Sequence, residues 1–276
     1  NNDQNHDILN AFVQHALTSK LNLQAEVRTR STHHGYLLQD FDRDSADPNA
    51  LQNRWRRNIN EDAVRVGARY DLSPNQSIIT SSQYSDRKNE NLGERLLKTN
   101  SEKIEGYQTE MQYQFRSSWF NLLAGSGVYR LNVDPTAELY SSVNTIQCCE
   151  NFGRNKTNGY VYSNLNLHSN LNATVGFSYD FYKEREHTVD RFSPKFGLQW
   201  NIASYLRLRM AWLETVKAPL TAHQTIEPTQ IAGFNQLFDD LNGTKSRRIG
   251  IGIDTHFRDK LFSGFEISDR DLNVPI

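Results

Sequence analysis

Apolar and polar residues alternate along much of the chain with a period of two. Between positions 21 and 30, Leu21, Leu23, Ala25 and Val27 occupy odd positions, and polar residues occupy the even positions. A helix would scatter this apolar set around its axis, whereas a strand places it on one face. The pattern predicts about twelve strands, each of about nine to eleven residues, the length that a tilted strand needs to cross a bilayer. The expected strands are 8–17, 21–30, 64–72, 77–86, 107–115, 119–131, 158–168, 171–182, 192–200, 206–212, 249–257 and 261–269.

The connections between the expected strands alternate in length. Short connections rich in Ser, Asn, Pro and Asp, which favour turns, follow the odd strands: 18–20, 73–76, 116–118, 169–170, 201–204 and 258–260. Long connections are expected after the even strands: 32–61, 87–104, 132–157, 183–191 and 217–246. Antiparallel outer-membrane barrels combine short periplasmic turns with long outer loops in this way. The expected fold class is therefore all-β, an antiparallel transmembrane β-barrel.

A soluble β-sandwich is the main structural alternative, because its strands also alternate apolar and polar positions. Sandwich strands run about five to six residues, shorter than those expected here. Aromatic residues such as Trp119, Trp200, Tyr205 and Phe257 lie near the ends of the expected strands, which is typical of girdles at the two bilayer surfaces. These features favour a barrel in the bacterial outer membrane, with the apolar face toward lipid and the polar face toward a lumen.

The composition agrees with a barrel once the alternation is known. The 276 residues have a formal net charge of −1 and a mean hydropathy of −0.70, as expected when only alternate strand residues are apolar. No window approaches 18 consecutive apolar residues, so a transmembrane helix is excluded. The near-zero charge gives no reason to expect a nucleic-acid partner.

Two segments resemble known outer-membrane families. Phe192–Trp200 (FSPKFGLQW) followed by Leu206–Trp212 (LRLRMAW) resembles hairpins of TonB-dependent receptor barrels. The segment 217–240, which contains EPTQIAGFNQLFDD, resembles the C-terminal barrel of bacterial outer-membrane proteins that carry periplasmic tetratricopeptide repeats. The general architecture is similar to that of exopolysaccharide-secretion porins, such as the poly-N-acetylglucosamine exporter.

The second resemblance implies a barrel of about sixteen strands, of which residues 1–276 form a partial domain. It implies periplasmic repeats before Asn1 and about four strands after Ile276. The function then expected is a transport or secretion pore for a hydrophilic solute or polymer such as an exopolysaccharide. Its partners would be outer-membrane lipid, periplasmic or inner-membrane secretion proteins, and the polar solute or polysaccharide itself.

Two other functions stay open. A structural or adhesin-like anchor would use the barrel only to display its outer loops. A TonB-dependent receptor would have a plug domain before Asn1 and a barrel of 22 strands.

Charged residues lie on the polar face of several expected strands. They predict either a charged wall that guides a polar solute or a ladder of Arg–carboxylate pairs that neutralises itself. The candidate lumen-lining residues are Glu26, Arg28, Arg30, Arg65, Arg69, Glu110, Arg207, Arg209, Arg248 and Asp254.

The 217–240 segment is long for a loop and unusually apolar. One interpretation folds it into the barrel mouth as a constriction or gate that faces solute; the other is a packed cap without solute contact. The candidate gating or mouth residues are Glu227, Phe234, Asn235, Gln236, Asp239 and Asp240.

Other candidate sites are weaker. The acidic segment 40–47 could supply oxygen ligands to Ca²⁺, but Ser45 and Leu51 replace the Gly and Glu of the EF-hand pattern. The adjacent Cys148 and Cys149 lack a third ligand nearby. No hydrolase, nucleotide-binding or metalloprotease motif occurs. The sequence therefore predicts no enzymatic activity, no bound metal ion and no cofactor.

Overall fold

The computed structural model describes residues 4–35, 56–92, 97–139, 149–217, 220, 224–236, 238, 240–258 and 260–275. The expectations for segment 40–47, Cys148 and Asp239 lie outside these residues. The strands are β1 (Gln4–Ala16), β2 (Leu21–Gly35), β3 (Arg56–Ser73), β4 (Gln76–Leu92), β5 (Leu97–Arg116), β6 (Phe120–Leu139), β7 (Phe152–His168), β8 (Leu171–Glu184), β9 (His187–Ala203), β10 (Leu206–Val216), β11 (Gln230–Ile231), β12 (Phe234–Asn235), β13 (Lys245–Phe257) and β14 (Leu261–Asn273).

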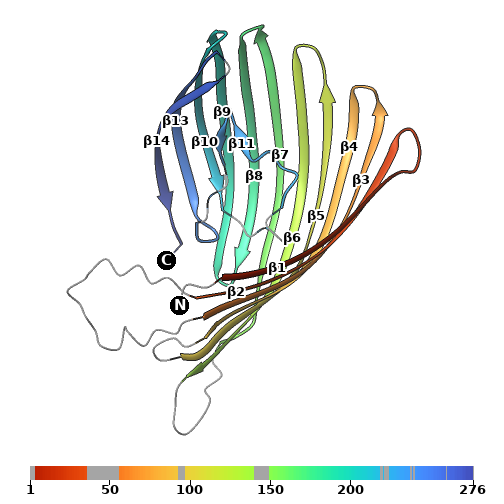
Figure 1. Ribbon diagram of the computed structural model, residues 1–276, viewed down its shortest axis with the longest axis vertical. Helices are drawn as coiled ribbons and strands as arrows, with labels where there is room; N and C mark the ends of the chain where they lie inside the picture. The colour runs from red at the N-terminus through yellow and green to blue at the C-terminus, as the bar shows by residue number, and fades with distance from the viewer. Residues whose placement is uncertain are drawn as a thin grey trace, which may run out of the picture.

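Twelve of these strands form one antiparallel sheet in chain order, from β1 to β10 and then β13 and β14. All twelve expected strands are therefore confirmed, and the expected total of sixteen stays a prediction. Figure 1 shows the sheet curling strongly between β1 and β14, which are its two edges. The described residues contain no helix long and apolar enough to cross a membrane, a result that has no bearing on crossing by strands.

The two faces of the sheet differ as the alternation predicts. Large apolar side chains such as Val66, Phe177 and Ile251 are exposed on the outer face. Polar side chains on the opposite parity, such as Gln83 and Lys195, are buried on the inner, concave face. In an ordinary soluble protein the apolar side chains are buried and the polar ones exposed. The opposite arrangement found here suits a sheet whose outer face contacts lipid.

Exposed aromatic residues gather at two levels of the outer face. Trp119, Tyr205 and Phe257 lie at or beside the short turns. Nearer the other end, Tyr84 pairs across the strands with Tyr107. The amphipathic rings of Tyr and Trp prefer the lipid–water boundary, so the two levels mark the expected girdles.

The predicted long connections at 87–104 and 183–191 are wrong. Strands β4 and β5 continue through most of the first segment, and only two residues separate Glu184 of β8 from His187 of β9. Beyond the apolar belt both faces of a strand meet water, so the alternation ends while the backbone ladder continues. The hydrophobic pattern therefore marks the membrane-facing part of each strand rather than its full length.

The described residues between β10 and β13, namely 217, 220, 224–236, 238 and 240–244, form a segment that we call the inner loop. It turns back against the concave face, where β11 and β12 form a short hairpin (Figure 1). Ala232 and Gly233 at the hairpin tip have φ angles of 50° and 84°. Two consecutive positive φ values are the mark of a type I′ turn, the tight turn that suits antiparallel strands.

Candidate functional site

The hairpin of the inner loop packs into an apolar patch on an otherwise polar wall. Ile231 and Phe234 are each 1% exposed, and they cluster with Tyr160, Tyr162 and Leu213 of the wall. Burial of a side chain of this size stabilises by about 1.5–3 kcal/mol relative to exposure. The two residues therefore anchor the hairpin to strands β7 and β10.

Two glycines in the wall make room for this anchor. A Cβ atom at Gly250 of β13 would lie 2.3 Å from Cε1 of Phe234. A Cβ atom at Gly197 of β9 would lie 2.7 Å from Cγ2 of Ile231. Any larger residue at either position would displace the hairpin, so the wall and the loop are complementary in shape.

Arginines flank the aromatic anchor on its other side. The guanidinium groups of Arg209 and Arg248 lie 5.1 and 5.4 Å from the centre of the Phe234 ring, a cation–π arrangement. Arg209 donates two hydrogen bonds, of 2.7 and 3.1 Å, to Asp254. Arg248 forms a 2.7 Å ion pair with Glu266 of β14. The cations are thus held by carboxylates while they contact the ring.

Three alternate residues of β5 hold the backbone of the inner loop. Gln108 Nε2 donates to the carbonyl of Gln224, and Gln112 Nε2 donates to the carbonyl of Ile226, both at 2.7 Å. Between them, Glu110 accepts from the Ile226 amide at 3.2 Å. Residues two apart point to the same face of a strand, so the spacing of these side chains matches the extended backbone that they bind.

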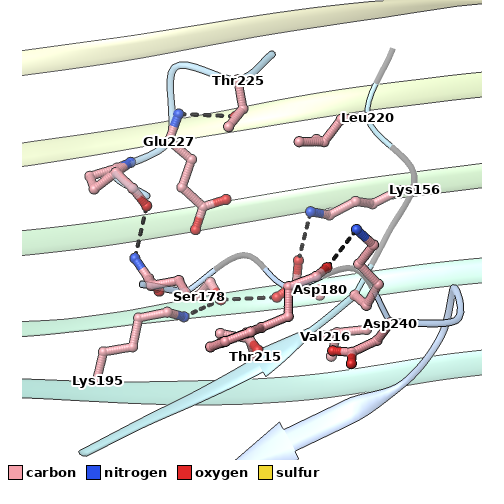
Figure 2. A pocket seen from close by; sticks show the side chains of 14 residues that line it. Lys156, Ser178, Asp180, Lys195, Thr215, Val216, Leu220, Thr225, Glu227 and Asp240 are labelled. Atoms are coloured by element: carbon pink, nitrogen blue, oxygen red, sulfur yellow. Dashed lines mark hydrogen bonds and ion pairs between the residues drawn. The ribbon is translucent and has the colours of Figure 1, made fainter. Parts of the chain in front are cut away.

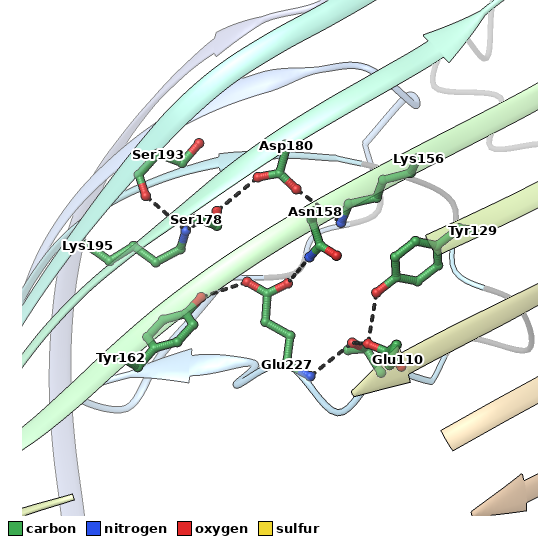
Figure 3. Close-up of polar contacts among 11 residues, drawn as sticks. Glu110, Tyr129, Lys156, Asn158, Tyr162, Ser178, Asp180, Ser193, Lys195 and Glu227 are labelled. Carbon is green, nitrogen blue, oxygen red and sulfur yellow. Dashed lines mark hydrogen bonds and ion pairs between the residues drawn. The ribbon is translucent and has the colours of Figure 1, made fainter. Parts of the chain in front are cut away.

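Glu110 is buried but fully supplied with donors. Its carboxylate accepts from the Tyr129 hydroxyl at 2.8 Å (Figure 3). It also accepts from Gln108 Nε2 and from the Thr225 hydroxyl, each at 2.6 Å. A buried carboxylate is costly unless such donors compensate for lost water. Two of its four donors belong to the inner loop, so its hydrogen bonding is complete only when the loop is docked.

A second carboxylate comes from the loop itself. Glu227 points at the wall, where it accepts from Asn158 Nδ2 at 2.8 Å and from the Tyr162 hydroxyl at 2.7 Å (Figure 3). Burial raises the pKa of Glu227 above its ordinary value of 4.5, against the opposing effect of Lys156 and Lys195. The docked loop therefore favours the neutral acid more than water does.

Two buried lysines lie next to Glu227 on the wall. Lys156 forms a 3.2 Å ion pair with Asp180. Lys195 donates to the Ser178 hydroxyl at 2.7 Å and to the carbonyl of Ser193 at 3.2 Å. Both lysines line a cavity of about 260 Å³ between strands β7 to β10 and the inner loop (Figure 2).

Most of the candidate lumen-lining residues are paired on the sheet. Arg65 lies 2.5 Å from Glu26, Arg28 lies 3.3 Å from Glu61, and the Arg69–Asp71 separation is 2.9 Å. These pairs favour the self-neutralising ladder. The remaining arginines contact neutral groups: Arg30 donates to Thr32, and Arg207 donates to Asn201. Their part in solute contact stays a prediction.

The structure separates the candidate mouth residues into two groups. Phe234 and Gln236 are buried, and Gln236 donates to the carbonyl of Pro228 at 2.8 Å. Glu227 contacts the wall as described, so these three stabilise the loop. Asn235 is exposed, and Asp240 forms an ion pair with Arg270 of β14.

The sequence interpretation missed several residues that hold the loop, namely Gln108, Gln112, Lys156, Asn158, Tyr160, Tyr162 and Lys195. The alternation carried a signal for them, because each has the parity of the polar face. Tyr160 and Tyr162 stand out, because two aromatic residues on the polar face of a strand need an apolar partner inside the barrel. Among the described residues, no three His, Cys, Asp or Glu side chains gather as metal ligands.

Comparisons with known proteins agree with this architecture. The family model "TonB dependent receptor-like, beta-barrel" matches residues 2–268. No curated protein matches the chain.

Several solved receptors share the fold at low sequence identity. A mutant ferric enterobactin receptor of Pseudomonas aeruginosa has a TM-score of 0.69 and 14% identity, over 98% of this chain and 42% of its own. A siderophore receptor of Acinetobacter baumannii has a TM-score of 0.67 and 13% identity, over 98% and 43%. The alcaligin receptor of Bordetella pertussis has a TM-score of 0.65 and 12% identity, over 98% and 44%.

The chain spans less than half the length of these solved receptors. The family match supports the resemblance of the 192–212 hairpin to TonB-dependent receptors rather than the resemblance to tetratricopeptide-repeat proteins. The alternating strands, the lipid-suited outer face and the match over nearly the whole chain converge on one conclusion: the chain belongs to the TonB-dependent-receptor-like β-barrels, a family of the bacterial outer membrane.

Proposed function

We propose that the protein is an outer-membrane receptor that takes up a polar solute, such as a ferric siderophore, in a TonB-dependent manner. The observation that carries the proposal is the family match across residues 2–268. The structural neighbours are receptors for ferric enterobactin, alcaligin and other siderophores. Those ligands belong to the neighbours and supply the substrate class proposed for this chain.

The docked inner loop gives independent support for a receptor over an open secretion pore. The loop occupies the concave face and is bound through Glu110, Glu227 and the Phe234 anchor. A pore that passes a polymer needs an unobstructed lumen. A receptor that releases solute only on energy input works with a lumen that is closed at rest.

Planar-bilayer recording from the full-length protein separates these two functions. A receptor is expected to show no steady conductance at rest. A steady, large conductance would favour the secretion pore and overturn the proposal. The recorded protein must first be shown to be folded, by its resistance to protease in detergent. An absence of conductance can then be attributed to a closed lumen.

A further inference from the structure

The cavity beneath the inner loop combines buried cations with apolar groups. Its lining includes the buried cations Lys156 and Lys195 on the wall and apolar groups of Leu220, Pro228 and Phe238 from the loop. Lys156, Asp180 and Glu227 point toward one another across the cavity (Figure 2). The wall side is therefore cationic and polar, and the loop side combines these apolar groups with the polar side chains of Thr225, Glu227 and Gln236.

The positive charge of the cavity is only partly balanced. Asp180 is occupied by Lys156, and Asp240 is occupied by Arg270. Glu227 already accepts from Asn158 and Tyr162.

Lys195 has no carboxylate at ion-pair distance within the part of the chain that the structure describes. Its ammonium uses two of its three N–H groups, toward Ser178 and Ser193. The ammonium also lies 5.8 Å from the centre of the Tyr162 ring, a cation–π contact. A cation that is 1% exposed, with a donor to spare and no carboxylate beside it, is nevertheless costly to bury. An anion in the cavity would supply the missing partner.

The size and the lining restrict the occupant. A cavity of about 260 Å³ is smaller than the pockets of about 300–1,000 Å³ that hold drug-sized ligands. The apolar side formed by Leu220 and Phe238 gives no hydrogen bonds to a fully polar anion such as phosphate. A short dicarboxylate satisfies both sides: its hydrocarbon chain meets Leu220 and Phe238, and its second carboxylate is offered to Lys217, which also lines the cavity.

We propose that a small carboxylate, of the size of succinate, binds in this cavity with its carboxylate at Lys195 and Lys156. It contacts the wall and the inner loop at once, so it stabilises the docked loop. The site lies behind the loop, and the ligand acts as an effector of loop docking rather than as the transported solute.

Binding can be measured on the full-length protein by isothermal titration with succinate at constant ionic strength. Succinamide is the matched probe, because it has nearly the same shape but no charge. We expect saturable binding of succinate and at least about tenfold weaker binding of succinamide, the loss typical of a charge-assisted hydrogen bond. Absence of saturable succinate binding, or equal binding of both probes, overturns the proposal.

Variants locate the binding to this cavity. Lys195→Met is expected to weaken succinate binding about tenfold or more, while Lys88→Met, on the outer end of β4, leaves it unchanged. Lys217→Met, at the half-buried edge of the cavity, provides a variant outside the wall core and is expected to weaken binding severalfold. Unchanged succinate binding in Lys217→Met, or in folded Lys195→Met, contradicts the assigned site.

A second readout tests the link to loop docking. Saturating succinate is expected to slow hydrogen exchange in peptides covering 224–236, and succinamide is expected to have no such effect. The titration needs no transport, so its failure leaves the proposed uptake function intact. Failure of uptake would likewise leave the binding result standing.

Discussion

The carboxylate of Glu110 accepts a 2.6 Å hydrogen bond from the hydroxyl of Thr225, a residue 115 positions further along the chain. This contact joins the middle of the wall to the inner loop, beside the hydrogen bonds that Gln108 and Gln112 donate to the loop backbone. It implies that the loop and the wall form one cooperative unit.

Replacing Glu110 with Ala is expected to loosen the inner loop. The change leaves the Ile226 amide and the Tyr129 hydroxyl without their acceptor, at a cost of about 1–3 kcal/mol for each group that stays buried. Hydrogen exchange of the peptide containing Ile226 should become at least about tenfold faster, since about 1.4 kcal/mol corresponds to a factor of ten. Glu105→Ala, on the same strand but half-exposed, is the matched control and should behave as the wild type.

Gly197 and Gly250 leave the recess in the wall that holds the hairpin, and this recess gives a steric test of loop docking. Gly250→Val should eject the hairpin, because the Cβ position lies 2.3 Å from the Phe234 ring. Protease cleavage within residues 224–236 should appear in this variant while the strands stay resistant. For comparison, a Cβ at Gly159 meets no atom closer than 3.9 Å, so Gly159→Ala should leave the loop protected. Equal protection of both variants would show that the hairpin does not use the recess.

The raised pKa of Glu227 predicts that docking weakens as the pH rises. A docked-state pKa above the undocked value means that the docked state binds more protons in the interval between them. The stabilisation is therefore fully present below about 4.5, the ordinary value, and is lost as the pH increases through the raised pKa. Exchange in peptides covering 224–236, corrected for intrinsic base catalysis, should accelerate over this interval.

Glu227→Gln is the informative variant for this pH dependence. The amide stays neutral, so the acceleration should disappear, whereas Glu186→Gln, in the exposed β8–β9 turn, should retain it. A pH dependence that survives in Glu227→Gln would assign the effect to another group.

The outer face provides a test of membrane contact. Ile251, which is 44% exposed, lies between Met210 and Ile267 in the middle of three strands. Ile251→Lys should lower the free energy of unfolding in liposomes by about 2–4 kcal/mol, the cost of a lysine near the bilayer midplane. Ile251→Leu should change it little. A tolerated lysine would argue that this face does not contact lipid.

Much of the sheet could be predicted from the sequence, because period-two alternation reports directly which side chains face lipid. The extensions of the strands could not be, since residues such as Arg87 and Lys88 are polar on both faces and resemble a loop. The hairpin at Ile231 and Phe234 was also missed as a structural element. Two strands of two residues each are too short to produce a periodic signal.

The site was less predictable than the sheet, for a physical reason. The sequence shows that Lys195 has the parity of the polar face, but its burial depends on a loop that arrives from more than twenty residues away. The partners of Glu227 likewise belong to another strand, β7, about 65 positions earlier. Contacts of this kind follow from the curvature of the sheet and the path of the inner loop.

Uptake of radioactive iron tests the central claim most directly. The full-length protein would be produced in a Gram-negative strain that lacks its own siderophore receptors, and a panel of ferric siderophores would be supplied with functional or inactivated TonB. The receptor account predicts that at least one ferric siderophore accumulates in the TonB-positive cells, and that this uptake is abolished when TonB is inactive. Uptake that persists without TonB, or no uptake of any ferric siderophore by cells that display the folded protein, would contradict it.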